Sequence, residues 1–229
     1  MATNPGDQFR GDQWDFVALD PDSRLVLSVC VGKRLLDNAV RLLQDVKARL
    51  SRTPELITSD EWAGYPEAIR QVFGVTVVPP RTGKRGRPAG PRQELPEGLN
   101  YATVHKTREQ GRVVRVVTCV VMGLVAVVQA LLGGKKVSTS YIERQNGTDR
   151  HRNARKGRKT YRFSKDYELH EALTYFTMYN YNFCWPVRTL RVPIGEGRYA
   201  ARTPAMVAGL TDHVWSLSEW LAFPACQRS

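Results

Sequence analysis

The alternation of short β-rich runs with a strongly amphipathic helix is the feature that most constrains the fold. Residues 14–31, WDFVALDPDSRLVLSVCV, place two β-rich runs around a Pro-Asp-Ser turn, which predicts a hairpin. Leucine, alanine and valine then recur at helical spacing over 33–51, and this pattern predicts an amphipathic helix. The run ELIT at 55–58 predicts a short buried strand after the helix. Strands interleaved with a helix in this way are typical of an α/β fold.

The rest of the chain also mixes helices and strands. We expect a strand at 75–78 and a second hairpin around a polar turn at 109–111. Further helices are expected at 65–74, at 123–134 as a short buried helix between glycines, from Ser140 through a basic stretch, and at 165–183.

Residues 191–229 are expected to form a helical C-terminal tail. Thr203 followed by Pro204 predicts the start of one helix, and Ser216 with Glu219 fits a capping box at the start of another.

Two segments lack apolar periodicity. Residues 1–13 are interpreted as a disordered lead-in. Residues 79–98, PPRTGKRGRPAGPRQELPEG, are interpreted as a flexible basic loop inserted in the fold. The loop is either a solvated linker or an arm that grips phosphates, and its composition favours neither. In the second case its DNA-binding residues are Arg81, Lys84, Arg85 and Arg87.

The net charge of the chain indicates which class of molecule it binds. The 229 residues include 34 Lys and Arg against 22 Asp and Glu, which gives a formal net charge of +12. Such a surplus favours a polyanion, and nucleic acid is the commonest one. A solvated or membrane-attracted basic surface is the alternative.

Hydropathy and cysteine spacing bear on location. No apolar run approaches the roughly 18 residues that a membrane span requires, and residues 1–13 lack the apolar core of a signal peptide. The four cysteines have no paired spacing, so they are interpreted as thiols of a reducing cytosol. We expect a cytoplasmic protein without a membrane partner.

The stretch from Arg144 to Lys165 is the strongest electrostatic feature. It contains nine Lys and Arg residues and one acidic residue, Asp149. Tyr161 and Phe163 within it are candidates to stack on bases. The alternative is a solvated charged face. The expected DNA-binding residues in and beside this stretch are Asn146, Arg150, Arg152, Arg155, Lys156, Arg158 and Lys159.

Glu143 stands at the start of this basic stretch. With Asn146 and Arg150 it falls at positions i, i+3 and i+7, which share one face of a helix. A carboxylate, an amide and a guanidinium in this row suit a metal ligand with DNA-gripping neighbours. Ser140 and Glu143 also fit a capping box, and in that interpretation the carboxylate only closes the helix.

Asp60 is the second candidate ligand. It comes just after the apolar run 55–58, and ligands commonly bind at strand ends in open α/β sheets. The alternative is a turn or helix-capping role before the sequence EWAGY. A third pattern, the aromatic stripe of Tyr175, Phe176, Tyr179 and Phe183, has helical spacing and is interpreted as core rather than as a base-stacking platform.

Five blocks carry a family resemblance: WDFVALDPDSRLVLSVCVGKR, LITSDEWAGYPEAI, STSYIERQNGTDR, FSKDYELHEALTYFTMYNYNF and TPAMVAGLTDHVWS. In this order, over residues 11–222, they resemble bacterial insertion-sequence transposases of the Asp-Asp-Glu superfamily. The resemblance implies a catalytic domain over 14–190 with a ribonuclease-H-like fold, in which helices flank a mixed sheet. It also implies double-stranded DNA, at element ends and target, as substrate, and a homo-oligomer as the working state. The location that it implies is the nucleoid in a bacterial cytoplasm.

The resemblance also implies a chemistry. Asp60 matches the second catalytic Asp of the family, Glu143 matches the catalytic Glu, and Arg150 matches a basic residue two turns further on. In such enzymes three carboxylates hold two Mg²⁺ or Mn²⁺ ions for in-line displacement at phosphorus. Water first nicks the element end, and the freed 3′-hydroxyl then attacks target DNA.

One departure from the family concerns the first catalytic Asp. In the family it lies on a central strand that precedes the first hairpin seen here, and residues 1–13 make a poor strand. Asp20 matches a non-catalytic Asp of the second strand and is the fallback first ligand. We therefore expect a truncated transposase, or one whose first part is encoded upstream, that binds DNA but does not cleave it alone.

Two other functions stay open at this point. One is a non-enzymatic basic nucleic-acid-binding protein derived from a transposase. The other is a basic RNA- or ribosome-associated protein, although no conventional RNA-reading motif occurs in the sequence.

Overall fold

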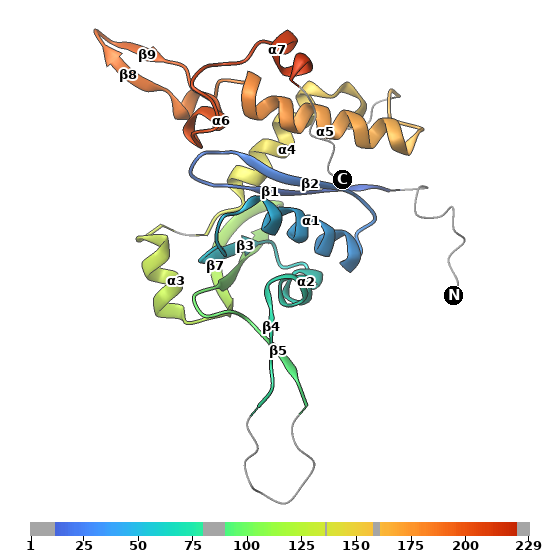
Figure 1. The fold of residues 1–229 in the computed structure, drawn as a ribbon, viewed down its shortest axis with the longest axis vertical. Helices are drawn as coiled ribbons and strands as arrows, with labels where there is room; N and C mark the ends of the chain where they lie inside the picture. The colour runs from blue at the N-terminus through green and yellow to red at the C-terminus, as the bar shows by residue number, and fades with distance from the viewer. Residues whose placement is uncertain (1–11, 80–89, 136, 158–160, 224–229) are drawn as a thin grey trace, which may run out of the picture. The chain divides into compact units, whose positions relative to one another are not determined.

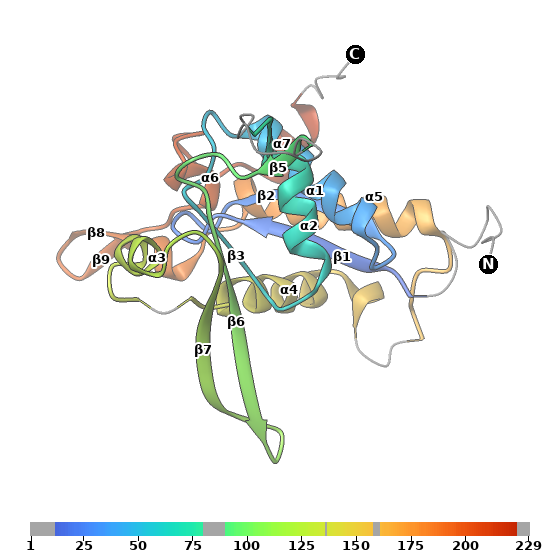
Figure 2. The same cartoon turned by 90° about the horizontal axis from the view of Figure 1, so that it is seen from below.

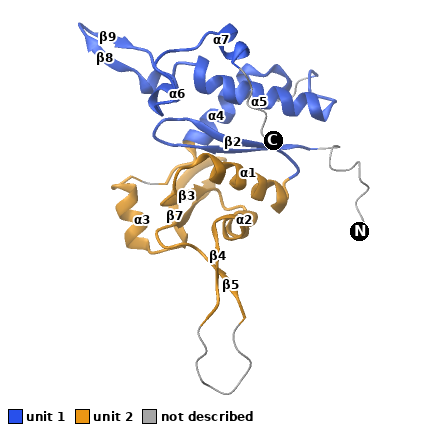
Figure 3. Cartoon of the chain, viewed as in Figure 1, with its two compact units in different colours: residues 1–33, 141–229 blue, residues 34–140 orange. Residues whose placement is uncertain are grey.

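The computed structural model describes residues 12–79, 90–135, 137–157 and 161–223 (Figure 1). They divide into two compact units (Figure 3). Unit 1 comprises residues 1–33 and 141–229, so it is built from both ends of the chain. Unit 2 comprises residues 34–140.

Unit 1 is organised around one hairpin and one long helix. Strands β1 (Trp14–Leu19) and β2 (Val26–Gly32) pair antiparallel, and helix α5 (Tyr167–Cys184) packs on β2. Asn182 ties the helix to the strand, because its side chain both accepts from the Val26 amide and donates to the Val26 carbonyl, each at 2.9 Å. Val26 and Val29 form the core of the unit with Met178 and Tyr181.

The remaining elements of unit 1 are short, apart from α4. They are helix α4 (Ser140–Arg152), whose first residue belongs to unit 2, the 3-10 turns η2 (Ala154–Lys156) and η3 (Arg188–Leu190), strands β8 (Val192–Gly195) and β9 (Arg198–Ala200), and helices α6 (Pro204–Val207) and α7 (Leu217–Ala222). Aromatic contacts hold α7 and the segment before it on α5: Phe176 meets Trp220 edge-on at 5.1 Å, and Phe183 packs on Trp215 at 4.7 Å. The aromatic stripe of α5 is thus half-buried within unit 1, whereas the residues that α5 buries in the core are Met178 and Tyr181.

Unit 2 contains a mixed sheet. Strand β3 (Leu56–Ser59) runs parallel to β6 (Asn100–Glu109), and β6 pairs antiparallel with β7 (Arg112–Met122) in a long hairpin (Figure 2). Helix α3 (Val125–Leu132) packs on this sheet through Val128, which is fully buried with Ala102 and Val104. The mixed sheet with helices confirms the prediction of an α/β fold.

Two amphipathic helices also belong to unit 2. Helix α1 (Leu36–Arg49) buries Ala39, Leu42, Leu43 and Val46, and helix α2 (Gly64–Phe73) packs against it. Lys47 links the two helices by donating to the Val72 carbonyl at 2.6 Å. The helices predicted at 33–51 and 65–74 are thus both present, with ends that differ by one to three residues.

Three expectations need correction. Part of the predicted loop 79–98 is a strand, β5 (Arg92–Glu94), which pairs with β4 (Val75–Val77). Helix α3 forms as predicted but fully buries only Val128; Leu132 is half-buried on the same cluster, and Val125, Val127 and Leu131 are exposed. The predicted helical tail also contains the hairpin of β8 and β9. Among the described residues, no helix is long and apolar enough to cross a membrane.

Candidate metal-binding carboxylates and nucleic-acid interface

Helix α4 has one face that is fixed to the rest of unit 1. Gln145 and Asp149 are buried, and Arg152 lies on the same side at helical spacing. Three polar contacts join this face to α5: Gln145 Nε2 to Met178 Sδ at 3.6 Å, Thr177 Oγ1 to Asp149 Oδ1 at 2.5 Å, and Arg152 to Asn180 Oδ1 at 2.7 Å. Polar contacts of this kind require defined geometry, so they fix the rotation of α4 about its axis.

The other face of α4 is turned away from α5. Glu143 and Arg150 are exposed and Asn146 is half-buried, so the three residues share one accessible helix face. The helix begins at Ser140, whose amide donates to Ser138 Oγ at 3.1 Å. The amide that a Ser140–Glu143 capping box would use therefore already has an acceptor.

Asp149 of α4 belongs to a buried ionic cluster. Lys156 Nζ is 2.7 Å from Asp149 Oδ2 and 2.9 Å from Asp15 Oδ2, and His170 Nε2 is 3.6 Å from the other oxygen of Asp15. The side chains of Lys156 and Asp149 are only 6% and 3% exposed. We call these four residues the Lys156 cluster.

The cluster sets the protonation of Asp15. Burial raises the pKa of this carboxyl group, but the nearby His170 and the charge of Lys156 outweigh burial. The pKa of Asp15 is therefore lower than its usual value, and the group is charged at neutral pH.

The cluster changes the list of candidate DNA contacts. The ammonium group of Lys156 forms a buried ion pair with Asp149 and is therefore a structural group. Arg152 donates a hydrogen bond to Asn180, and its guanidinium lies over the Trp185 ring at 4.6 Å. Burial lowers the pKa of Arg152, although the group stays charged at neutral pH. Arg150 and Arg155 are exposed and remain the described candidates for phosphate contacts. The predicted contacts Arg81, Lys84, Arg85, Arg87, Arg158 and Lys159 lie outside the described residues.

Asp60 lies in unit 2, directly after β3. Its Oδ1 accepts from the Trp62 amide at 3.3 Å, and its Oδ2 is 3.8 Å from the Arg34 guanidinium. The side chain is 61% exposed. The N-cap of α2 is Ala63, so Asp60 shapes a turn but does not cap the helix.

Aromatic side chains support the backbone around Asp60. Ser59 Oγ is 2.7 Å from the Tyr101 hydroxyl, which ties the end of β3 to β6. Trp62 meets Tyr65 edge-on at 5.1 Å. Burial, with a smaller contribution from the Asp60 charge, raises the pKa of Tyr65, so this phenol stays neutral.

The structure places the two candidate metal ligands in different units, Asp60 in unit 2 and Glu143 in unit 1. The fallback ligand, Asp20, has a structural role in the β1–β2 turn: its carboxylate accepts from the Ser23 amide at 2.9 Å and from the Ser23 hydroxyl. Within the described ranges, no group of three or more His, Cys, Asp or Glu side chains is arranged to hold a metal ion.

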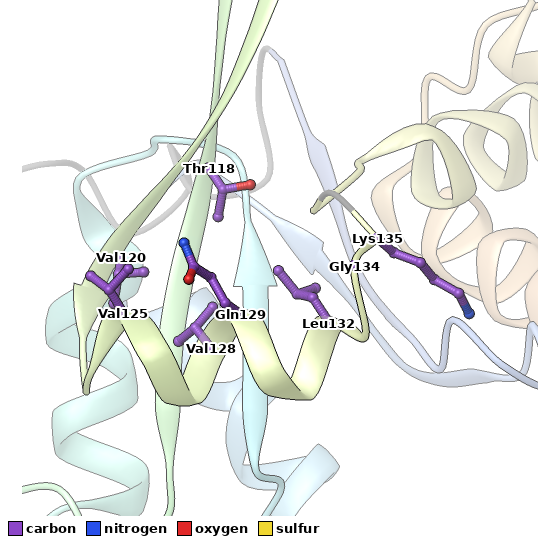
Figure 4. A pocket seen from close by; sticks show the side chains of 8 residues that line it. All are labelled: Thr118, Val120, Val125, Val128, Gln129, Leu132, Gly134 and Lys135. Atoms are coloured by element: carbon purple, nitrogen blue, oxygen red, sulfur yellow. The ribbon is translucent and has the colours of Figure 1, made fainter.

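Unit 2 also contains a groove of about 410 Å³ between α3 and β7 (Figure 4). Its lining is mostly apolar and consists of Thr118, Val120, Val125, Val128, Gln129, Leu132, Gly134 and Lys135. The lining includes no carboxylate, cysteine or histidine, so these lining residues supply no metal ligand of those types.

Sequence reasoning missed the Lys156 cluster and a second charged group in unit 1. His213 lies 2.6 Å from Asp212 and 2.7 Å from Glu219, in the segment that leads into α7. One signal was present for the cluster, since Asp149 is the lone acid in the basic stretch. Its partner Asp15 is far away in the sequence, and no local pattern links the two.

Comparison with known proteins identifies no relative. The chain matches no protein-family model, no curated protein and no solved structure.

Proposed function

We propose that the chain is the catalytic region of a DNA transposase of the Asp-Asp-Glu superfamily, with a ribonuclease-H-like fold, and that Asp60 and Glu143 bind its divalent metal. The main support for this proposal is that α4 has one buried face and one accessible face. One face is fixed on α5, and the other presents Glu143, Asn146 and Arg150 to solvent in the order that the resemblance implies.

The surroundings of Asp60 support its role. The residue follows a parallel strand of a mixed sheet, and its carboxylate is accessible rather than buried in a structural ion pair. The pairing with Arg34 is long and exposed, and such pairs contribute little stability. A cation can therefore displace the guanidinium at small cost.

The donor chemistry of these two residues fits Mg²⁺ or Mn²⁺, which prefer oxygen ligands. When bound, the metal would supply the Lewis acidity for displacement at phosphorus. The residues of the chain contribute binding and orientation: Arg150 and Arg155 neutralise backbone phosphates, and Asn146 donates to a phosphate or base edge. Duplex DNA at the element ends and at the target is the proposed substrate, and a homo-oligomer the proposed working form.

A non-enzymatic DNA-binding protein derived from a transposase is the second candidate. Two observations favour it: Asp20, the fallback third carboxylate, is engaged in its own turn, and the described residues contain no three-carboxylate group. Both candidates share DNA binding, and they differ in whether Asp60 and Glu143 act together on a metal.

Duplex binding measured with and without Mg²⁺ tests the proposal. If about six phosphates are neutralised, affinity falls roughly a thousandfold between 50 and 200 mM salt. We expect Mg²⁺ to raise the affinity of the wild type but not of Asp60→Asn or Glu143→Gln, while all three bind equally in chelator. Absence of duplex binding would exclude both candidates. A Mg²⁺ response that survives either substitution would leave only the non-enzymatic function.

A further inference from the structure

The hairpin of β8 and β9 is not used by the proposed active site. Its strands pair antiparallel, with Val192 opposite Ala200 and Pro193 opposite Tyr199, and they form a sheet of their own (Figure 1). Gly195, Glu196 and Gly197 at its tip all adopt the left-handed backbone region, which two glycines make possible at low cost. We call residues 188–202 the β8–β9 arm.

The arm is exposed over most of its length. Every residue from 191 to 199 is exposed, including large apolar side chains. The exposed fractions are 57% for Ile194, 51% for Tyr199 and 37% for Val192. Apolar side chains gathered on a projecting element mark an interaction surface more often than a structural one.

The charge on the arm has one dominant sign. Residues 188–202 contain four arginines and one acid, Glu196. Arg198 pairs with Glu196 at 3.0 Å, and the Arg191 guanidinium lies over the Tyr199 ring at 4.0 Å. This cation–π contact keeps the guanidinium of Arg191 beside Tyr199 on the neighbouring strand before any ligand binds.

The base of the arm is well anchored in unit 1. The Val187 amide donates to the Arg202 carbonyl at 3.0 Å, which closes the hairpin. Arg202 itself donates to the Met206 carbonyl at 3.2 Å, and buried Thr203, Pro204 and Ala205 follow directly. A fixed base with an exposed tip suits an element that reaches into a partner.

We propose that the β8–β9 arm binds in the major groove of duplex DNA. The inference rests on the proposed function in taking DNA as the partner. A two-stranded ribbon fits the major groove, which is about 12 Å wide, but not the minor groove of undistorted DNA, which is about 6 Å wide. Arg191, directly before β8, and Arg198, on β9, supply positive charge for the polyanion, whereas a second copy of this chain, itself at +12, would meet them with like charge.

Each part of the arm has a role in this arrangement. Arg191 and Arg198 contact phosphates on the two sides of the groove, and the surface pair of Arg198 with Glu196 exchanges readily for a phosphate contact. Ile194, near the tip, meets the base edges, where an apolar side chain can contact the thymine methyl group. Glu196 opposes binding through its charge.

The salt dependence of duplex binding by the full chain tests the arm. Each phosphate contact contributes about 0.9 to the slope of log K against log salt, so Arg191→Ala with Arg198→Ala should reduce the slope by about 2. The matched control, Arg52→Ala with Arg70→Ala, removes the same charge from exposed arginines of unit 2 and should leave the slope near that of the wild type. Equal slopes for the wild type and the arm variant, or equal reductions in both double variants, would overturn the inference.

Three further measurements do not depend on the folding of the double variant. Ile194→Ser should weaken binding without changing the slope, and Glu196→Ala should strengthen it. Bound wild type should protect guanine N7, in the major groove, from dimethyl sulfate, and protection of adenine N3 alone would overturn the groove assignment. If the wild type binds no duplex at all, the proposed function fails; if it binds and the arm variants bind equally well, only the arm inference fails.

Discussion

Lys156 Nζ lies 2.7 Å from Asp149 Oδ2, and both side chains are almost completely buried. This ion pair lies inside the most basic stretch of the chain, where the sequence placed Lys156 and Arg152 among the expected DNA contacts. The stretch is therefore divided in two. Lys156 and Arg152 hold α4 against the body of unit 1, and Arg150 and Arg155 face solvent.

Removal of Lys156 should destabilise the protein strongly. Lys156→Ala leaves the buried Asp149 carboxylate without its partner, and breaking a buried pair in this way costs about 3–5 kcal/mol. Arg155→Ala, one residue away and exposed, should change the free energy of unfolding by no more than about 0.5 kcal/mol. Urea denaturation of both variants measures the difference, and similar values for the two would show that the Lys156 cluster is not structural.

Acid should weaken the same cluster through Asp15. Because the folded pKa of Asp15 is below its usual value of 3.8, its stabilisation is complete above that pH and is lost as the pH falls through the folded pKa. We expect Asp15→Asn to be less stable than the wild type at neutral pH and to lose less stability below pH 4. Urea midpoints between pH 7 and pH 2.5 test this, and parallel curves would contradict it.

His213 should give unit 1 a pH dependence of the opposite sign. Hydrogen bonds to Asp212, and to a lesser extent Glu219, raise the pKa of His213 above its usual value of 6.5. The stabilisation is therefore complete below pH 6.5 and is lost as the pH rises through the folded pKa. Trp215 stacks near this imidazole at 6.4 Å, so tryptophan fluorescence should report the transition. His213→Gln should remove the transition and His151→Gln should not.

Gly123 should tolerate no side chain. Its φ is +95°, and an added Cβ would overlap Oδ1 of Asn100, whose amide donates to the carbonyls of Glu55 and Gly98. Gly111, at φ +79°, has open space around it. Alanine at Gly111 should cost about 1–2 kcal/mol for the left-handed backbone, and alanine at Gly123 clearly more. Thermal unfolding of the two variants measures these losses of stability. Equal losses would show that the Asn100 side chain moves away from the new Cβ without an energetic cost.

The sequence predicted those helices, strands and caps that are specified by residues close together in the chain. The two hairpins, the amphipathic helices and the caps at Thr203 and Ser216 all follow from alternation, helical periodicity or short-range hydrogen bonding. The shared face of Glu143 and Arg150 follows from the same periodicity.

Elements that depend on a distant partner were missed. The polar run of β5 forms a strand only because β4 pairs with it, with Gln93 donating to Thr76 at 3.0 Å. Strand β8 was not predicted because it contains Pro193, and a proline within a run of residues argues against a strand. The pairing of Asp15 with Lys156 joins the first strand to a turn after α4, and no sequence window contains both residues.

Manganese binding followed by electron paramagnetic resonance tests the central claim most directly. If Asp60 and Glu143 share a divalent cation, the wild type should bind Mn²⁺, and Asp60→Asn and Glu143→Gln should each lose the same site. Asp20→Asn, which alters only the hairpin turn, should keep it. Mn²⁺ binding that is unchanged in either Asp60→Asn or Glu143→Gln would show that the two carboxylates do not meet at one metal, and the transposase assignment would fail.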